Sequence, residues 1–60
     1  MRRAELMRHL RLHGVVVIRE GRRHTIVGNG VWKTQVPRHR ELVDELARQI
    51  CKDLDIPFVR

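Results

Sequence analysis

The chain has 60 residues, of which 13 are Lys or Arg and seven are Asp or Glu, so its formal net charge is +6. A chain of this length buries only about 60% of the surface of its unfolded form, which predicts a single domain over residues 1–60 and excludes a large cofactor-binding fold. One cysteine excludes an internal disulfide and a zinc ribbon. The longest apolar run, residues 15–18, is far below the ~20 residues that span a bilayer, and no secretory stretch is recognisable at the N-terminus. We therefore expect a cytoplasmic protein with no membrane association.

The positive charge is concentrated in residues 1–40, where ten Lys or Arg stand against two acids, a balance of +8. Residues 41–60 carry a balance of −2. A local positive field suits a polyanion, because phosphates that the protein neutralises release their counterions. An acidic protein partner also fits, and surface charge can serve solubility alone. The composition leaves these interpretations open.

The first element expected along the chain is a helix. Apolar residues recur at helical spacing over residues 4–12, with acidic Glu5 near the beginning and basic residues near the end. Gly14 follows, and glycine commonly ends a helix because it accepts a left-handed backbone. We expect this helix to stop at Leu12 or His13.

Three strands joined by short turns are expected next. The β-branched run of residues 15–20 and the run of residues 23–27 favour an extended backbone. The Gly-Asn-Gly segment at residues 28–30 predicts a tight hairpin, because its Asn-Gly pair supplies the positive φ angles that such a turn needs. Residues 31–36 then alternate apolar and polar side chains, and Pro37 ends this third strand because it removes a ladder donor.

The last expected element is the longest helix, marked by an apolar stripe over residues 42–54. Three acids, Glu41, Asp44 and Glu45, occupy its expected first turn, although no Ser, Thr or Asn stands ready to cap it. The order is α-β-β-β-α. Short connections turn this order into an α+β domain with a three-stranded antiparallel sheet and both helices on one face.

Two residues that could carry chemistry fit a structural role better. Cys51 belongs to the apolar stripe of the second helix, so we expect a buried thiol that acts as a small hydrophobe. Trp32 could stack on a base, but its alternation with Thr34 and Val36 predicts a place in the core.

The four histidines differ in their surroundings. His9 and His13 stand four residues apart on the first helix, but no third ligand accompanies them at helical spacing, so we expect no metal site. His39 stands between two arginines in a loop, where contact with a phosphate or a tertiary hydrogen bond is favoured over catalysis.

His24 directly follows Arg22 and Arg23, so a ring that can transfer protons lies beside two guanidinium groups suited to phosphate. RNA cleavage needs a base for the 2′-hydroxyl, an acid for the leaving oxygen and positive charge for the developing phosphorane. A strand histidine beside arginines is also a common structural or binding residue. Alternation does not say which face of the sheet carries His24, since both faces have an apolar member. Catalysis and binding both stay open.

The chain resembles a known family in two sequence segments and in the order of its expected elements. The segments read Gly-Arg-Arg-His-Thr at residues 21–25 and Val-Pro-Arg-His-Arg-Glu-Leu at residues 36–42, before an amphipathic helix with Leu-Ala-Arg-Gln-Ile-Cys-Lys-Asp-Leu at residues 46–54. Over nearly its whole length the chain resembles the HicA, or YcfA-like, family of toxins. The resemblance implies a fold like that of double-stranded-RNA-binding domains. It also implies an mRNA interferase of a toxin-antitoxin module, which cleaves RNA with no metal or cofactor.

The resemblance further implies a catalytic residue and a partner. The family's catalytic histidine follows a glycine by a few residues in the second strand, which is the place of His24. Arg22 and Arg23 would then hold the scissile phosphate, and Arg38 and Arg40 would extend the binding face. A HicB-like antitoxin would inhibit the enzyme by covering His24 or inserting there.

Two functions of other classes stay open beside the toxin. The first is a non-catalytic RNA-binding module with the same basic face. The second is a protein-interaction domain whose basic surface meets an acidic partner. Only the enzyme would lose product formation when His24→Ala leaves the fold intact.

Overall fold

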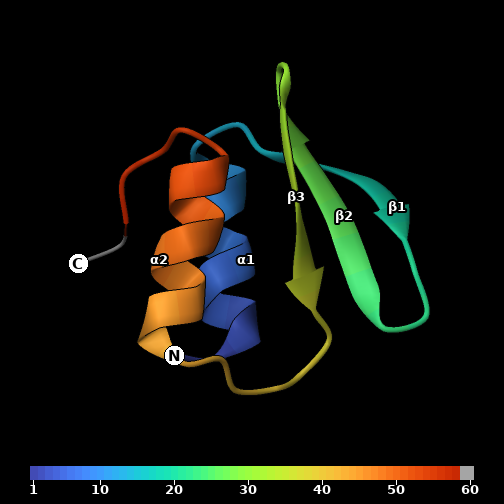
Figure 1. Cartoon of the computed structure of the whole chain (residues 1–60), viewed down its shortest axis with the longest axis vertical. Coiled ribbons are helices and arrows are strands. Elements are labelled where there is room, and N and C mark those ends of the chain that lie inside the picture. Colours follow the sequence, from blue (N-terminus) through green and yellow to red (C-terminus); the bar gives the residue numbers. More distant parts are fainter. Residues whose placement is uncertain (59–60) are drawn as a thin grey trace.

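The structure, a computed structural model, describes residues 1–58, so residues 59–60 of the expected domain lie outside the described part. Helix α1 spans Arg3–Leu12, strands β1, β2 and β3 span Val16–Glu20, His24–Asn29 and Trp32–Pro37, and helix α2 spans Asp44–Asp53 (Figure 1). The predicted order α-β-β-β-α is confirmed, as is the antiparallel sheet, whose strands lie in the order β1-β2-β3. The likeness to a double-stranded-RNA-binding domain stays a prediction.

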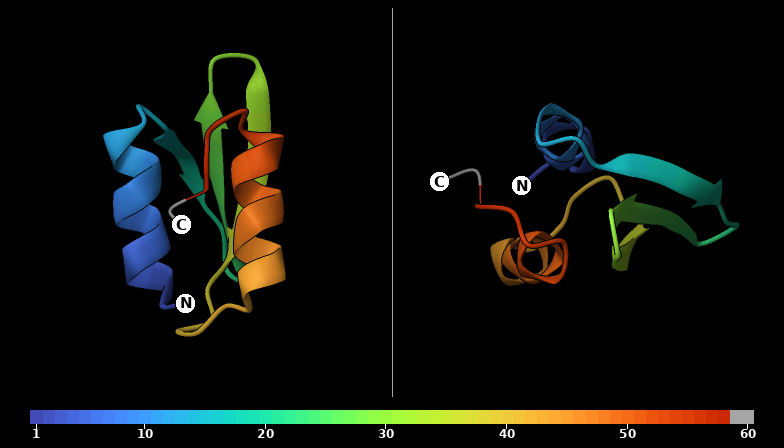
Figure 2. Two further views of the ribbon diagram at one scale, coloured as in Figure 1. Left: turned by 90° about the vertical axis from the view of Figure 1, so that its left-hand side faces the viewer. Right: turned by 90° about the horizontal axis from the view of Figure 1, so that it is seen from above.

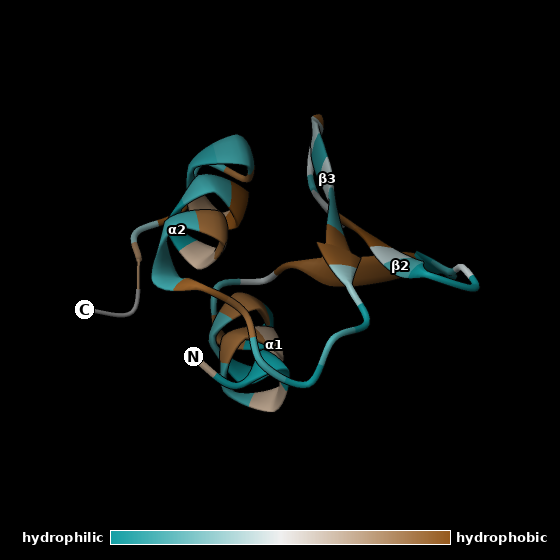
Figure 3. Cartoon of the chain, turned by 60° about the horizontal axis from the view of Figure 1, so that its bottom comes forward, coloured by the Kyte–Doolittle hydropathy of each residue, from teal (hydrophilic) through white to brown (hydrophobic). Residues whose placement is uncertain are grey.

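The two helices lie side by side on one face of the sheet (Figure 2). Their apolar stripes face the sheet, and Figure 3 shows hydrophobic stretches on both helices and along the strands. The buried hydrophobic side chains are Leu6, Leu10, Val15, Val27, Val36, Leu42, Ala47, Ile50, Cys51 and Leu54. Burial of each Leu or Ile stabilises the fold by roughly 1.5–3 kcal/mol relative to an exposed position. The core therefore lies between the helices and the inner face of the sheet.

Strand β2 shows which of its two faces is covered. Thr25 and Val27 are buried under the helices, whereas His24 is exposed and Ile26 is half-buried. Because side chains alternate along a strand, His24 and Ile26 lie on the open face. This answers the question that alternation in the sequence had left open.

The turn between β2 and β3 differs from the one expected. Asn29 pairs with Trp32, so the two-residue loop is Gly30-Val31. Gly30 has φ +62°, but Asn29 keeps a negative φ, and the prediction of positive φ at both Asn and Gly is wrong. Asn29 stays in the strand, where its Nδ2 donates to the Leu54 carbonyl oxygen at 2.8 Å. Positive φ at the first central residue only is typical of a type II′ turn.

The prediction that Trp32 lies in the core is wrong, because its side chain is 49% exposed. Trp32 begins β3 at the hairpin tip, and this tip extends past the ends of both helices (Figure 1). Val36, four residues further along the same strand, is fully buried. The alternation of β3 is therefore as expected, but the helices cover only its second half.

Helix α2 begins at Asp44, so Glu41 is not in its first turn as predicted. Glu41 instead forms an isolated bridge with Arg2, and its carboxylate lies 3.3 Å from the Met1 ammonium group. The same ammonium group donates to the Leu42 carbonyl oxygen at 2.9 Å. These contacts hold the segment before α2 in an extended conformation against the beginning of α1.

Cys51 is buried on α2, as predicted, and burial raises the pKa of its thiol because it disfavours the thiolate. A thiol with these properties acts as a small hydrophobe and not as a nucleophile. Within residues 1–58, neither helix has the length and apolar character needed to cross a membrane.

Candidate functional site

A surface depression of about 530 Å³ lies where β1 ends, β2 begins and β3 ends. It is lined by Arg22, Arg23, His24, Pro37, Arg38 and His39. Four of the five site residues predicted from the sequence therefore lie together, although they come from two separate segments of the chain. The fifth, Arg40, does not line this depression.

The turn before β2 places the first three of these residues. Glu20 pairs with Thr25, and the Gly21 N–H donates to the His24 carbonyl oxygen at 2.8 Å. This close turn leaves Arg22 and Arg23 exposed at its end. Within residues 1–58 neither arginine makes an ion pair, so both guanidinium groups can bind an anion.

Arg38 is the one arginine of the depression that has a carboxylate partner among the described residues. Its Nη1 donates to Glu20 Oε1 at 2.9 Å and to the Gly21 carbonyl oxygen at 3.2 Å. Its backbone N–H donates to the Arg23 carbonyl oxygen at 3.1 Å. These bonds hold the segment after β3 against the turn before β2.

Behind the depression, a polar network joins α1 to the sheet. Arg3 donates through Nε to the Pro37 carbonyl oxygen at 2.8 Å and through Nη2 to the Thr25 hydroxyl oxygen. Thr25 in turn donates to Glu20 Oε1 at 2.7 Å. Buried polar groups are costly unless they are hydrogen-bonded, and Thr25 has partners on both sides. The network fixes the relative positions of the strand ends that carry the site.

His39 is a candidate that the sequence-based set of site residues lacks. Its exposed side chain lines the same depression as His24. His24 pairs with Pro37 in the β2–β3 ladder, and His39 follows Pro37 by two residues. An antiparallel register with Pro37 opposite His24 would have indicated this proximity, but the position of the turn, which sets the register, was mispredicted by one residue.

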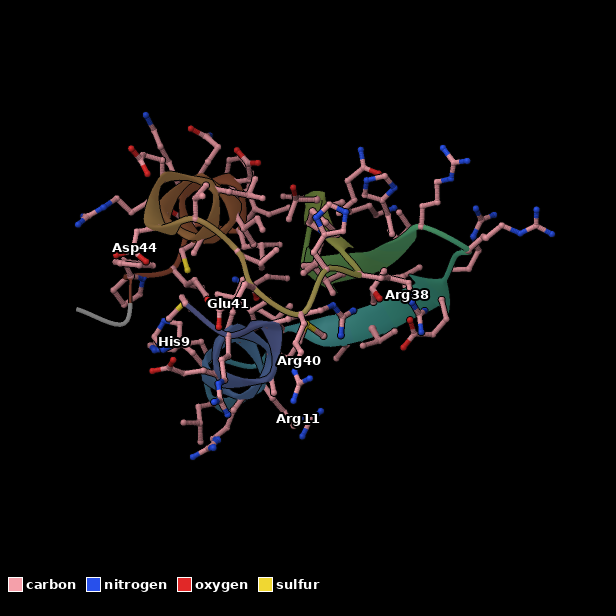
Figure 4. All side chains as sticks on the ribbon, turned by 90° about the horizontal axis from the view of Figure 1, so that it is seen from below. His9, Arg11, Arg38, Arg40, Glu41 and Asp44 are labelled. Atoms are coloured by element: carbon pink, nitrogen blue, oxygen red, sulfur yellow. The ribbon has the colours of Figure 1, made fainter. Side chains whose placement is uncertain are left out.

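The other predicted candidates lie outside the depression. Arg40 lies closer to α1 than Arg38 does (Figure 4), and its carbonyl oxygen accepts a hydrogen bond from the Arg3 N–H at 2.9 Å. His9 Nε2 lies 2.7 Å from the Pro57 carbonyl oxygen, and its ring centroid is 4.6 Å from that of His13. In the part of the chain that the structure describes, no group of three or more His, Cys, Asp or Glu side chains is placed to hold a metal ion.

The depression combines two exposed imidazole rings with three guanidinium groups. Guanidinium groups bind phosphate oxygens in a planar, two-pronged geometry, and imidazole can give or take a proton near neutral pH. The acids of α2 are on the opposite side of the sheet, because α2 packs on the helix-covered face, where Thr34 Oγ1 donates to Asp53 Oδ2 at 3.1 Å. The site therefore suits a phosphodiester better than a cation.

Comparison with protein-family models, with curated proteins and with solved structures finds no match for this chain.

Proposed function

We propose that this chain is an endoribonuclease of the HicA-like toxin family in which His24 transfers a proton during RNA cleavage. The observation that carries the proposal is the depression in which His24 lies with Arg22, Arg23 and Arg38. These are the groups that cleavage of RNA by its own 2′-hydroxyl requires: a proton-transferring ring and cations for the phosphate. The family resemblance of residues 21–25 and 36–42 supports the same function.

The reaction is an internal displacement at phosphorus. A general base removes the proton of the 2′-hydroxyl, the 2′-oxygen bonds to phosphorus, and the bond from phosphorus to the 5′-oxygen breaks. A general acid protonates that oxygen, which leaves a 2′,3′-cyclic phosphate and a 5′-hydroxyl. His24 performs one of the two proton transfers. Arg22 and Arg23 bind the phosphate and stabilise the charge that develops on it, so the reaction needs no metal ion or cofactor.

The substrate that we propose is mRNA in the cytoplasm, and the regulating partner is a HicB-like antitoxin. Arg38 and Arg40 would extend the phosphate-binding face toward α1. An acidic segment of the antitoxin would complement this face and cover His24, because opposite charges favour both encounter and correct orientation. The acidic side of α2 would then point away from RNA.

Cleavage of a long unstructured RNA in the presence of EDTA tests the proposal. We expect the purified protein to cleave the RNA, and we expect His24→Ala to lower the rate by roughly 100- to 10,000-fold because one proton transfer is lost. His24 is exposed, so the variant should keep its circular-dichroism spectrum and its unfolding midpoint. The matched control is His13→Ala, which removes another exposed imidazole on α1 outside the depression.

Each alternative function has its own outcome in this experiment. Equal cleavage by the wild-type protein and His24→Ala would contradict the assignment of His24. Binding of RNA without any cleavage by the wild-type protein would establish the non-catalytic RNA-binding module instead. Tight binding to an acidic protein without affinity for RNA at low salt would favour a protein-interaction domain.

A further inference from the structure

Cleavage of RNA by its own 2′-hydroxyl requires two proton transfers, and one histidine accounts for only one of them at a time. Among the residues that line the depression, the arginines stay protonated and Pro37 has no titratable group. The nearby Glu20 carboxylate already accepts hydrogen bonds from Thr25 and Arg38. His39 is the remaining residue in the lining that can give or take a proton.

The structure also holds His39 in place, although it lies outside the helices and strands. The residue before it, Arg38, is bonded through its backbone N–H to the Arg23 carbonyl oxygen at 3.1 Å. The residue after it, Arg40, accepts a hydrogen bond from the Arg3 N–H at 2.9 Å. His39 is therefore anchored through both chain neighbours, while its own side chain is exposed. Within residues 1–58, neither the His39 ring nor the His24 ring is engaged in a hydrogen bond to the protein.

The distance between the two histidines suits a single phosphodiester. His24 and Pro37 are paired across β2 and β3, and His39 is two residues beyond Pro37. Paired Cα atoms of an antiparallel ladder are at most about 5.5 Å apart, and consecutive Cα atoms of the chain are about 3.8 Å apart. The Cα atoms of His24 and His39 are therefore no more than about 13 Å apart. Two imidazole side chains that line one depression from this separation can reach the two ends of one linkage, where the 2′-hydroxyl and the 5′-oxygen are.

We infer that His39 is a second catalytic residue, and that His24 and His39 divide the two proton transfers of RNA cleavage between them. One ring takes the proton of the 2′-hydroxyl as the 2′-oxygen bonds to phosphorus. The other ring gives a proton to the 5′-oxygen as its bond to phosphorus breaks. The inference rests on the proposed ribonuclease function and adds to it a second catalytic group, supplied by the loop after β3.

A leaving group that needs no proton tests this division of roles. Two RNA oligonucleotides of one sequence are compared: one normal, and one in which the 5′-oxygen of the cleaved linkage is replaced by sulfur. A thiolate leaves without help from an acid, so loss of the general acid slows only the normal substrate. The proteins are wild type, His24→Ala, His39→Ala and the control His13→Ala.

We expect both His24→Ala and His39→Ala to cleave the normal oligonucleotide roughly 100- to 10,000-fold more slowly than wild type. On the sulfur substrate, one of the two variants should return to within about tenfold of wild type, and the other should stay slow on both substrates. The recovering variant then identifies the general acid. The slow variant identifies the general base.

Several outcomes would overturn the inference. His39→Ala could cleave the normal substrate within about threefold of wild type, which would remove His39 from the chemistry. Equal losses on both substrates for both variants would make His39 a binding residue. If His39→Ala fails to fold, His39→Asn replaces it with a smaller change of shape. Inactivity of the wild-type protein on both substrates would refute the ribonuclease function itself, a result distinct from loss of the two-histidine assignment.

Discussion

Gly21 determines where the backbone of His24 lies. Its N–H donates to the His24 carbonyl oxygen at 2.8 Å, and a Cβ at this position would stand 2.6 Å from the same oxygen. The opposing atom belongs to the backbone, so it cannot move aside as a side chain could. A glycine shortly before the histidine is therefore required by the close approach of two backbone segments.

We predict that Gly21→Ala destabilises the protein by about 1–3 kcal/mol through this overpacking and also slows RNA cleavage, because the turn that presents His24 must shift. The matched control is Gly30→Ala at the far end of the β2–β3 hairpin. Its φ of +62° makes alanine unfavourable by about 1–2 kcal/mol, without any contact to the site. Urea unfolding and kcat/KM, measured where both variants are folded, check the prediction. Cleavage at the wild-type rate by Gly21→Ala would contradict it.

Strand β1 contains a bulge that changes the face of the sheet on which Glu20 lies. Val17 pairs with Val27 and Arg19 pairs with Ile26, so Ile18 is an extra residue in the strand. The extra residue resets the alternation of side chains, and Glu20 comes to the helix-covered side opposite Thr25. From there it accepts hydrogen bonds from both Thr25 and Arg38. A regular strand would have turned this carboxylate to the open face.

Helix α2 begins without a side-chain cap. Its N-cap residue, Val43, has the extended φ of −69° and ψ of 149°, and its side chain is 66% exposed. We predict that Val43→Ser stabilises the protein by about 1 kcal/mol relative to Val43→Ala, because the serine hydroxyl can accept a hydrogen bond from an N–H of the first turn. Chemical denaturation measures the difference. Equal free energies of unfolding for the two variants would refute the prediction, and RNA cleavage should be the same in both.

At the scale of the whole molecule, the depression and the acids in the first turn of α2 lie on opposite sides of the sheet. His24 lies on the open face of the sheet, near Arg22 and Arg23, which have no ion-pair partner within residues 1–58, while α2, with acids in its first turn, covers the other face. An RNA backbone can therefore approach the arginines of the depression without meeting the acids of α2, whereas the basic residues of α1 lie on the same face as α2. This arrangement follows from both helices packing on one face of the sheet.

We predict that RNA affinity falls linearly with the logarithm of salt concentration, and that Arg22→Gln/Arg23→Gln reduces the slope by about 1.4, since each phosphate contact on a single strand contributes about 0.7. Arg48→Gln/Lys52→Gln removes the same charge from α2 and should leave the slope unchanged. Binding titrations with one oligonucleotide over a series of salt concentrations check both. The same change of slope in both double variants would show that net charge alone, and not the depression, binds RNA.

Most of the fold was predictable from the sequence, because it depends on local patterns. The stripe around Ala47 and Ile50, the β-branched run of β1 and the glycine after α1 all report periodicity or backbone preference within a few residues. The errors have longer-range causes. Asn29 keeps a strand conformation because its side chain donates a hydrogen bond to the Leu54 carbonyl oxygen. Trp32 is exposed because the β2–β3 hairpin extends past the ends of both helices. Neither effect can be read from neighbouring residues.

The sequence by itself determined the element order, the antiparallel sheet, the buried Cys51 and the set of basic residues around His24. Only the tertiary structure decided that His24 lies on the open face, that Glu20 holds Arg38, and that His39 shares the depression with His24. The physical reason is that side-chain periodicity reports a face but not what covers it. Which residues meet at a site depends on strand register and on helix packing, and both are set by contacts between distant parts of the chain.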